Sequence, residues 1–218
     1  MARFIDRHGR PSSGQMPGLV EALVVDNRDP AQLGRVKVQF PTLPEMPESA
    51  WARLNMPMAG RERGWMTIPE IGDEVLVSFM HGDFNHAVVV GSLYNGVDTP
   101  PYANEDGQNN LRVFQSRSGH RVTFDDTEGD ERIELVTNNQ QVRIILDAAS
   151  QVVSVYCGGD IHVECEEHFD IKAESLALSA DKGVSIQAGD GIVVQAGTVA
   201  GVLGQQQVQI QAPDVLIN

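Results

Sequence analysis

Small residues recur at almost fixed spacing through the C-terminal part of the chain, seven or eight positions apart, in a repeat that we call the octad. Aliphatic residues lie two and four positions before most of them. The small positions are Cys157, Cys165, Ala173, Ala180, Ala188, Ala196, Gly204 and Ala212. Because side chains alternate between the two faces of a strand, each octad places its two aliphatic residues and its small residue on one face. The octads therefore predict short β-strands separated by turns.

A single octad cannot bury its apolar face or pair its own backbone groups, so each strand must pair with others. Such a repeat is typical of an elongated β-solenoid or of an intertwined β-prism. A single-chain β-helix usually needs about twenty residues per coil to enclose a core. One apolar strand per repeat instead favours a prism shared by three chains, since homo-oligomers commonly adopt closed symmetry. We therefore expect a homotrimer with an intertwined triple-stranded β-helix.

The composition restricts the kinds of partner that the chain can bind. The 218-residue chain has a net charge of -14, which disfavours binding to nucleic acid or to an anionic membrane surface. Both cysteines occupy octad small positions, which indicates compact apolar residues and not a disulfide or metal pair. No run is apolar enough for a transmembrane helix, and no apolar segment of a signal peptide follows the charged N-terminus. We expect assembly in the bacterial cytoplasm.

Four segments follow one another along the chain. Residues 1–16 predict an arm that orders against a partner. Residues 17–96 contain five short alternating runs bounded by Gly, Pro or Asp, which predict an all-β oligonucleotide/oligosaccharide-binding (OB) barrel. Residues 97–113 predict a linker, and residues 114–218 the trimeric β-helix spike. The predicted barrel strands are Leu19–Val25, Arg35–Phe40, Trp51–Met56, Glu74–Met80 and Ala87–Leu93; those between linker and octads are Leu111–Ser116, Arg121–Phe124, Arg132–Val136 and Gln141–Leu146.

Several runs of this sequence resemble the barrel and the following segment of VgrG proteins and phage baseplate spikes. They are residues 34–40, residues 68–79 (IPEIGDEVLVSF), Gly82-Asp83, residues 88–96 (VVVGSLYNG), residues 100–102 (PPY) and residues 118–126 (SGHRVTFDD). The resemblance implies a trimeric central spike of a contractile injection machine, which is a phage tail, a tailocin, an extracellular injection system or a type VI secretion system. In that family the barrel docks on a hub at the end of the tail tube. In the same family the prism enters the target envelope first, and the spike acts mechanically.

Three departures from the family pattern limit what the resemblance implies. Only sixteen residues precede the barrel, so we expect the hub to come from another polypeptide. The linker is too short to hold the lysozyme domain of some phage spikes. The last ten residues lack the His-x-His element that gathers iron at some spike tips, so we expect a PAAR-type tip protein as the cap. Its predicted contacts are Asp214, Val215, Leu216, Ile217 and Asn218.

Clusters of His and acidic residues could suggest metal sites. His81, Asp83 and His86 lie within six positions, but they flank a glycine in a predicted hairpin turn, where polar residues are ordinary. In the octads, the pairs His162 with Glu164 and Glu166 with His168 each share a strand face. The favoured interpretation is that this is the solvated outer face of the spike. We expect neither a metal nor a cofactor.

Catalytic motifs give no support for an enzyme. The paired acids Asp125-Asp126 and Glu166-Glu167 lie in a turn and on an octad, and no GxSxG, HExxH or P-loop motif occurs. Only Arg35 and Lys37 form a basic stripe on the barrel, which is weak support for nucleic-acid binding. Two alternatives to the spike remain: a trimeric fibre or adhesin that binds surface glycans, and a cell-wall hydrolase subunit.

A loop rich in Met and Pro lies between Trp51 and Trp65. The simpler interpretation is that both indoles pack in the barrel. The alternative is that the loop, with the N-terminal arm, forms the surface that faces the hub. The predicted hub contacts in this loop are Arg61, Glu62 and Arg63.

Overall fold

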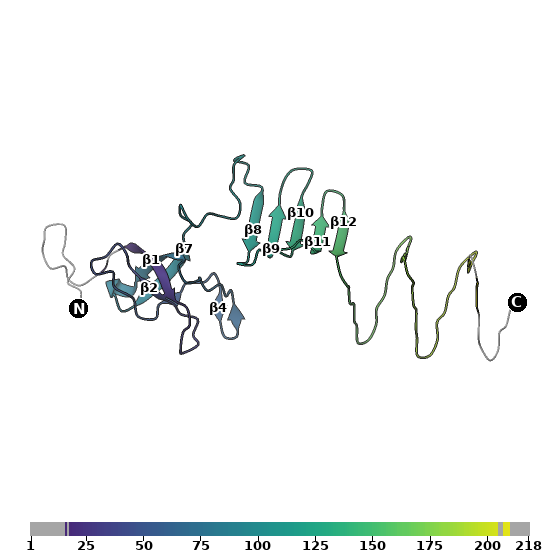
Figure 1. Cartoon of the computed structure of the whole chain (residues 1–218), viewed down its shortest axis with the longest axis horizontal. Helices are drawn as coiled ribbons and strands as arrows, with labels where there is room; N and C mark the ends of the chain where they lie inside the picture. Colours follow the sequence, from purple (N-terminus) through teal and green to yellow (C-terminus); the bar gives the residue numbers. More distant parts are fainter. Residues whose placement is uncertain (1–15, 17, 205–206, 210–218) are drawn as a thin grey trace. The chain divides into compact units, whose positions relative to one another are not determined.

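The computed structural model of the chain describes residue 16, residues 18–204 and residues 207–209. It divides into two compact units, one that ends at Ile161 and one that begins at His162. Regular structure in the described residues is almost wholly β, and the exception is a 3₁₀ turn, η1, at Met80–Gly82 (Figure 1). Within these residues, no helix has the length and apolar character needed to cross a membrane. The all-β class predicted from the sequence is confirmed.

The first sheet closes into a barrel. Its strands are β1 (Leu19–Asp26), β2 (Lys37–Gln39), β3 (Arg53–Leu54), β6 (Glu74–Phe79) and β7 (Ala87–Ser92), in the order β2-β1-β6-β7-β3. An antiparallel bridge between Val36 and Ala52 joins the two ends of this order. The pair exchanges two hydrogen bonds, from Val36 N to Ala52 O at 3.0 Å and from Ala52 N to Val36 O at 2.7 Å. The five runs predicted from alternation therefore form one closed sheet.

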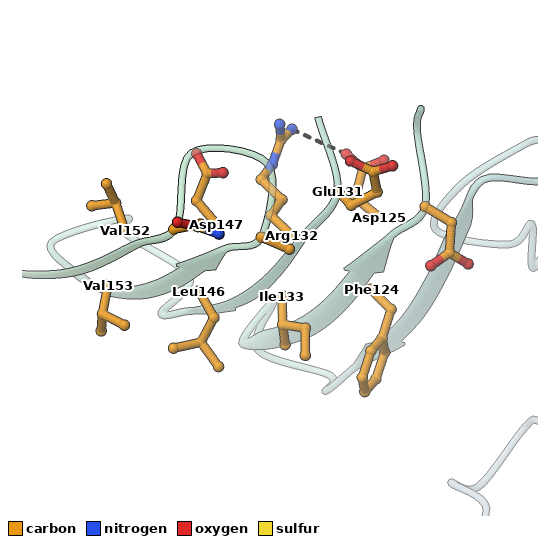
Figure 2. Close-up of a pocket in the computed structure, with 12 residues that line it drawn as sticks. Phe124, Asp125, Glu131, Arg132, Ile133, Leu146, Asp147, Val152 and Val153 are labelled. Carbon is orange, nitrogen blue, oxygen red and sulfur yellow. Dashed lines mark ion pairs between the residues drawn. The ribbon is translucent and has the colours of Figure 1, made fainter. Parts of the chain in front are cut away.

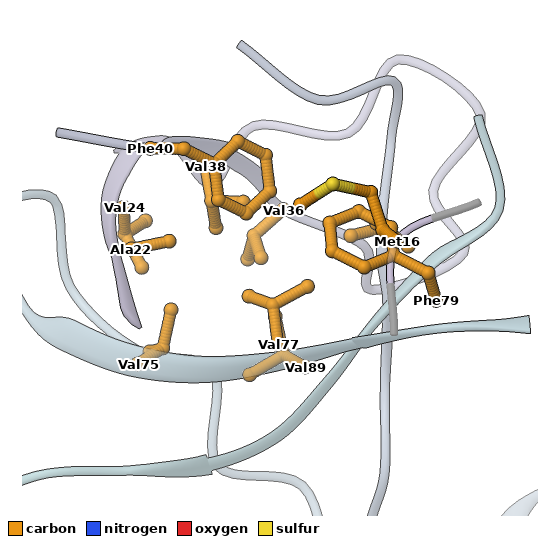
Figure 3. Close-up of a cluster of buried hydrophobic side chains, with 12 residues drawn as sticks. Met16, Ala22, Val24, Val36, Val38, Phe40, Val75, Val77, Phe79 and Val89 are labelled. Carbon is orange, nitrogen blue, oxygen red and sulfur yellow. The ribbon is translucent and has the colours of Figure 1, made fainter. Parts of the chain in front are cut away.

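Alternating side chains fill the interior of the barrel (Figure 3). Along β6, Val75, Val77 and Phe79 are buried while the residues between them are half-buried. Phe40 is 0% exposed, and its ring centroid lies 5.6 Å from that of Phe79 and 5.3 Å from that of Phe84. The buried core residues of the barrel are Met16, Ala22, Val24, Val36, Val38, Phe40, Ala52, Val75, Val77, Phe79, Ala87 and Val89.

A small hairpin that the sequence patterns do not predict lies between β3 and β6. Its strands are β4 (Ala59–Gly60) and β5 (Arg63–Gly64). Gly64 has a φ of +152°, and a Cβ atom there would lie 2.7 Å from the carbonyl oxygen of Met58. A glycine is therefore required at this position for the two short strands to meet.

The second sheet is an antiparallel meander. Its strands are β8 (Leu111–Gln115), β9 (Arg121–Asp125), β10 (Arg132–Val136), β11 (Val142–Asp147) and β12 (Val152–Cys157), and each pairs with its neighbour in the chain. We predicted that the run ending at Cys157 is the first octad. It forms the last strand of this meander instead, because a four-residue turn brings it back against β11, with Val142 opposite Cys157 and Asp147 opposite Val152.

The octads after β12 carry no strand in residues 158–204 of the single chain. Their aliphatic side chains are exposed; among them are Ile161, Val163, Ile171, Leu176, Leu178, Val184, Ile186, Ile192 and Val194. A strand is defined by its hydrogen-bonded neighbour, and the octads in residues 158–204 have no such neighbour among the described residues. The predicted trimeric β-helix therefore stays a prediction.

Candidate functional site

The meander has one face that is almost entirely apolar, here called the apolar sheet face. Antiparallel register places Phe124, Ile133, Leu146 and Val153 in one row across four strands, and Figure 2 shows their side chains on the same side of the sheet. A second row runs through Phe114, Val122, Leu135, Ile144 and Val155. The face also includes Val142 and Cys157.

Among the described residues, little of the chain covers this face. Val153 is 68% exposed and Phe124 is 47% exposed, although each lies on a strand of a regular sheet. A hollow of about 410 Å³ opens between Phe114, Val122 and Leu135. Isolated exposed apolar residues are ordinary, but a contiguous apolar face of this extent marks an interaction surface.

The opposite face of the same sheet is mixed, and it carries Arg132 at one end of β10 as well as the apolar residues Ile145 and Val152. The Arg132 guanidinium contacts Asp125 at 3.1 Å and Glu134 at 2.9 Å, and it also pairs with Asp130. Figure 2 shows Arg132, Asp125 and Asp147 on the side of the sheet away from the apolar rows. The sheet therefore has one face of mixed polarity, on which Thr123, Asp125 and Val136 are buried, and one face that is almost entirely apolar.

The predicted hub contacts lie on the β4–β5 hairpin. Arg61 and Glu62 form its turn, with Glu62 at a φ of 54°, and Arg63 begins β5; all three are exposed. Beside them, the Trp65 ring meets the Phe114 ring edge-on at a centroid distance of 6.1 Å. The hub role of these residues stays a prediction, and the predicted tip contacts, Asp214 to Asn218, lie outside the described residues.

The His and acidic residues singled out from the sequence do not assemble into one cluster. Asp83 Oδ2 lies 2.8 Å from His86 Nδ1, while His81 lies in the 3₁₀ turn at a φ of 53°. The Asn85 backbone N–H and the His86 ring together lower the pKa of Asp83. No group of three or more potential metal ligands occurs in the part of the chain that the structure describes.

The other residues singled out from the sequence make contacts only with residues near them in the chain or on the same sheet. Glu164, Glu166, His162 and His168 are exposed. The thiol of Cys165 donates to the backbone carbonyl of His168 at 3.0 Å. The thiol of Cys157 donates to the backbone carbonyl of Asp160 at 3.3 Å. Of the paired acids, Asp125 is buried, and its bonds from Thr127 help lower its pKa. Asp125 is therefore an ionised partner of Arg132 at neutral pH.

Comparison with known proteins shows what the chain is similar to. Residues 20–94 match the model of the type VI secretion system/phage-baseplate injector OB domain. These residues span the five barrel strands described above. A segment of 110 residues, 47% of this chain, is 34% identical to the type VI secretion system spike protein VgrG3 of Vibrio cholerae. The barrel therefore matches an injector OB domain, and the chain is similar to VgrG spike proteins.

Two other VgrG proteins match longer segments of the chain. The actin cross-linking toxin VgrG1 of Vibrio cholerae is 28% identical over 173 residues, which are 76% of this chain and 16% of the toxin. The type VI secretion system spike protein VgrG1a of Pseudomonas aeruginosa is 32% identical over 131 residues, or 55% of this chain and 20% of that protein. The chain thus spans no more than about a fifth of these relatives.

Sequence patterns missed the apolar sheet face, although a signal for it exists. Val122 and Phe124, Ile133 and Leu135, and Ile144 and Leu146 are spaced by two in consecutive strands. Strand register was needed to place these pairs on one face, and the register depends on the length of each turn.

We expect acid to destabilise the fold below about pH 4, because the pKa values of Asp29, Asp83, Asp125 and Asp147 are lowered from the ordinary 3.8. A carboxylate with a lowered pKa stabilises the fold above its unfolded pKa and loses that contribution as pH falls through its folded pKa. Thermal unfolding measured near pH 7, 5 and 3 should give similar midpoints at the first two and a lower one at the third. A midpoint that falls between pH 7 and 5 would contradict this assignment.

Proposed function

We propose that this chain is a central spike of a contractile injection apparatus and acts as a homotrimer. Three copies would place their apolar sheet faces toward one another and interlace their octads. Burial of large aliphatic or aromatic side chains stabilises an assembly by about 1.5–3 kcal/mol each when burial is complete. The two apolar rows of the meander are the observation that carries the proposal, since the single chain leaves them in water.

The similarity to VgrG spike proteins supports a proposal for the partners. We propose that the barrel seats on a hub protein of the baseplate, with Arg61, Glu62 and Arg63 among its contacts, and that a PAAR-type protein caps the residues from Asp214 to Asn218. We also propose that the chain assembles in the bacterial cytoplasm and then becomes part of a virion or injection particle. The action on the target envelope is mechanical and requires no catalytic group or cofactor.

The mass of the protein in solution tests the homotrimer. Light scattering on the purified chain should give three times the chain mass of 23.7 kDa. The mass should persist on dilution, because interlaced strands separate slowly. A folded protein with the mass of one chain at micromolar concentration would overturn the proposal.

Deletion of residues 215–218 tests the proposed tip contact. The deletion should leave the trimer mass unchanged and abolish capture of a PAAR-type protein from the same bacterial strain in a pull-down. Lys182→Gln, a change of an exposed octad residue, serves as the control and should leave capture intact. Undiminished capture by the shortened chain would defeat this assignment.

A further inference from the structure

Two arginines lie opposite each other on the outer surface of the barrel. The antiparallel bridge between Val36 and Ala52 makes Arg35 the cross-strand neighbour of Arg53. Val36 and Ala52 are buried, so their neighbours along the chain face outward. Like charges at opposite positions of a sheet destabilise it. A violation of a local rule of this kind often marks a functional position.

Asp29 neutralises one of the two arginines and has no capacity left for the other. Its carboxylate accepts from Arg35 Nε and Nη2, each at 2.8 Å. It also accepts from the backbone N–H groups of Ala31, Leu33 and Arg35 at 3.0–3.3 Å. Within the described residues, no hydrogen bond or ion pair reaches the Arg53 side chain, so its charge is uncompensated.

A pocket of about 300 Å³ lies beside these arginines. Its apolar walls are Leu33, which is 69% exposed, and Trp51, which is half-buried. Asn85 and His86 supply polar groups at the wall, and His86 is held by Asp83. The ammonium of Lys37 lies 5.3 Å from the centroid of the Trp51 ring and adds a second positive charge nearby.

We propose that this pocket binds an acidic segment of a partner protein, with a carboxylate of the partner on Arg53 and its aliphatic carbons against Leu33 and Trp51. A guanidinium is well suited to bind a carboxylate through two parallel hydrogen bonds. The net charge of -14 on the chain disfavours the phosphate backbone of a nucleic acid as the occupant. A single acidic side chain can approach this local cation. Only the identity of that partner as a baseplate protein rests on the proposed spike function.

Fluorescence of Trp51 in the full chain tests the pocket. The chain has two tryptophans, so Trp65→Phe leaves Trp51 as the reporter. The probe is a blocked peptide containing Glu-Leu-Glu, compared with the same peptide containing Gln-Leu-Gln and with oligothymidylate. We expect saturable emission changes with the acidic peptide, and binding about tenfold weaker in Arg53→Gln. Lys172→Gln removes an equal charge from an exposed octad residue and should leave binding unchanged.

Each other outcome overturns the proposal. Equal affinity for the Gln-Leu-Gln peptide, unchanged affinity in Arg53→Gln or no saturable change would show that the pocket does not bind carboxylates. A stronger response to oligothymidylate would assign the pocket to nucleic acid. Since Arg53 is exposed, Arg53→Gln should retain the thermal stability and solution mass of the unmodified chain. Failure of the pocket is therefore distinguishable from failure of the trimeric spike.

Discussion

Val153→Asp is expected to abolish the proposed trimer. Val153 lies in the row of Phe124, Ile133 and Leu146 on the apolar sheet face, and three copies would bring three carboxylates into a shared apolar interior. An unpaired charge buried in such surroundings costs about 3–5 kcal/mol. The solution mass at micromolar concentration should fall from that of three chains to that of one. Light scattering after size-exclusion chromatography provides the measurement.

Ser154→Asp is the matched control, since Ser154 is the next residue of β12 and faces the opposite side of the sheet. The same charge placed there should leave the trimer intact. Val153 is 68% exposed in the single chain, so an aspartate at this position has no reason to unfold the isolated sheet. A trimer that survives Val153→Asp, or that is lost equally in Ser154→Asp, would contradict the assignment of the apolar sheet face as the interface.

The barrel strands could be predicted from the sequence because the barrel buries one face of each strand. Val75, Val77 and Phe79 alternate with half-buried residues, so the period of two is visible in the sequence. The β4–β5 hairpin has strands of only two residues, from Ala59 to Gly60 and from Arg63 to Gly64. No period can be read from two residues. The need for glycine at position 64, where a side chain would clash with the Met58 carbonyl, becomes visible only in the structure.

The apolar sheet face and the pocket beside Arg53 both depend on which strands pair and in what register. A local sequence pattern does not show this pairing. The apolar sheet face exists because Leu146 lies opposite Ile133 and Val153 in the register of three strands. The pocket beside Arg53 is lined by Leu33 and His86, which are distant in the chain and meet because the barrel closes. The octads show the limit most clearly, since their periodicity predicts strands whose partners lie in other chains.

Phe40→Ala is expected to destabilise the barrel by about 3–5 kcal/mol, the usual cost of removing a buried aromatic ring. Phe40 is 0% exposed, and its ring contacts those of Phe79 and Phe84, so truncation leaves a cavity between two aromatic neighbours. A domain is stable by only about 5–15 kcal/mol. Urea unfolding followed by tryptophan emission should therefore show a much lower midpoint.

Phe124→Ala also removes a phenylalanine ring, but from the apolar sheet face, where Phe124 is 47% exposed in the single chain. It should leave the urea midpoint of the barrel unchanged and weaken the proposed trimer, in which the lost contact would lie between chains. The effect of Phe40→Ala should not depend on protein concentration, whereas that of Phe124→Ala should increase on dilution. A dependence on concentration in both variants would mean that the barrel is part of the trimer interface. If neither variant shows it, the apolar sheet face does not join the three chains.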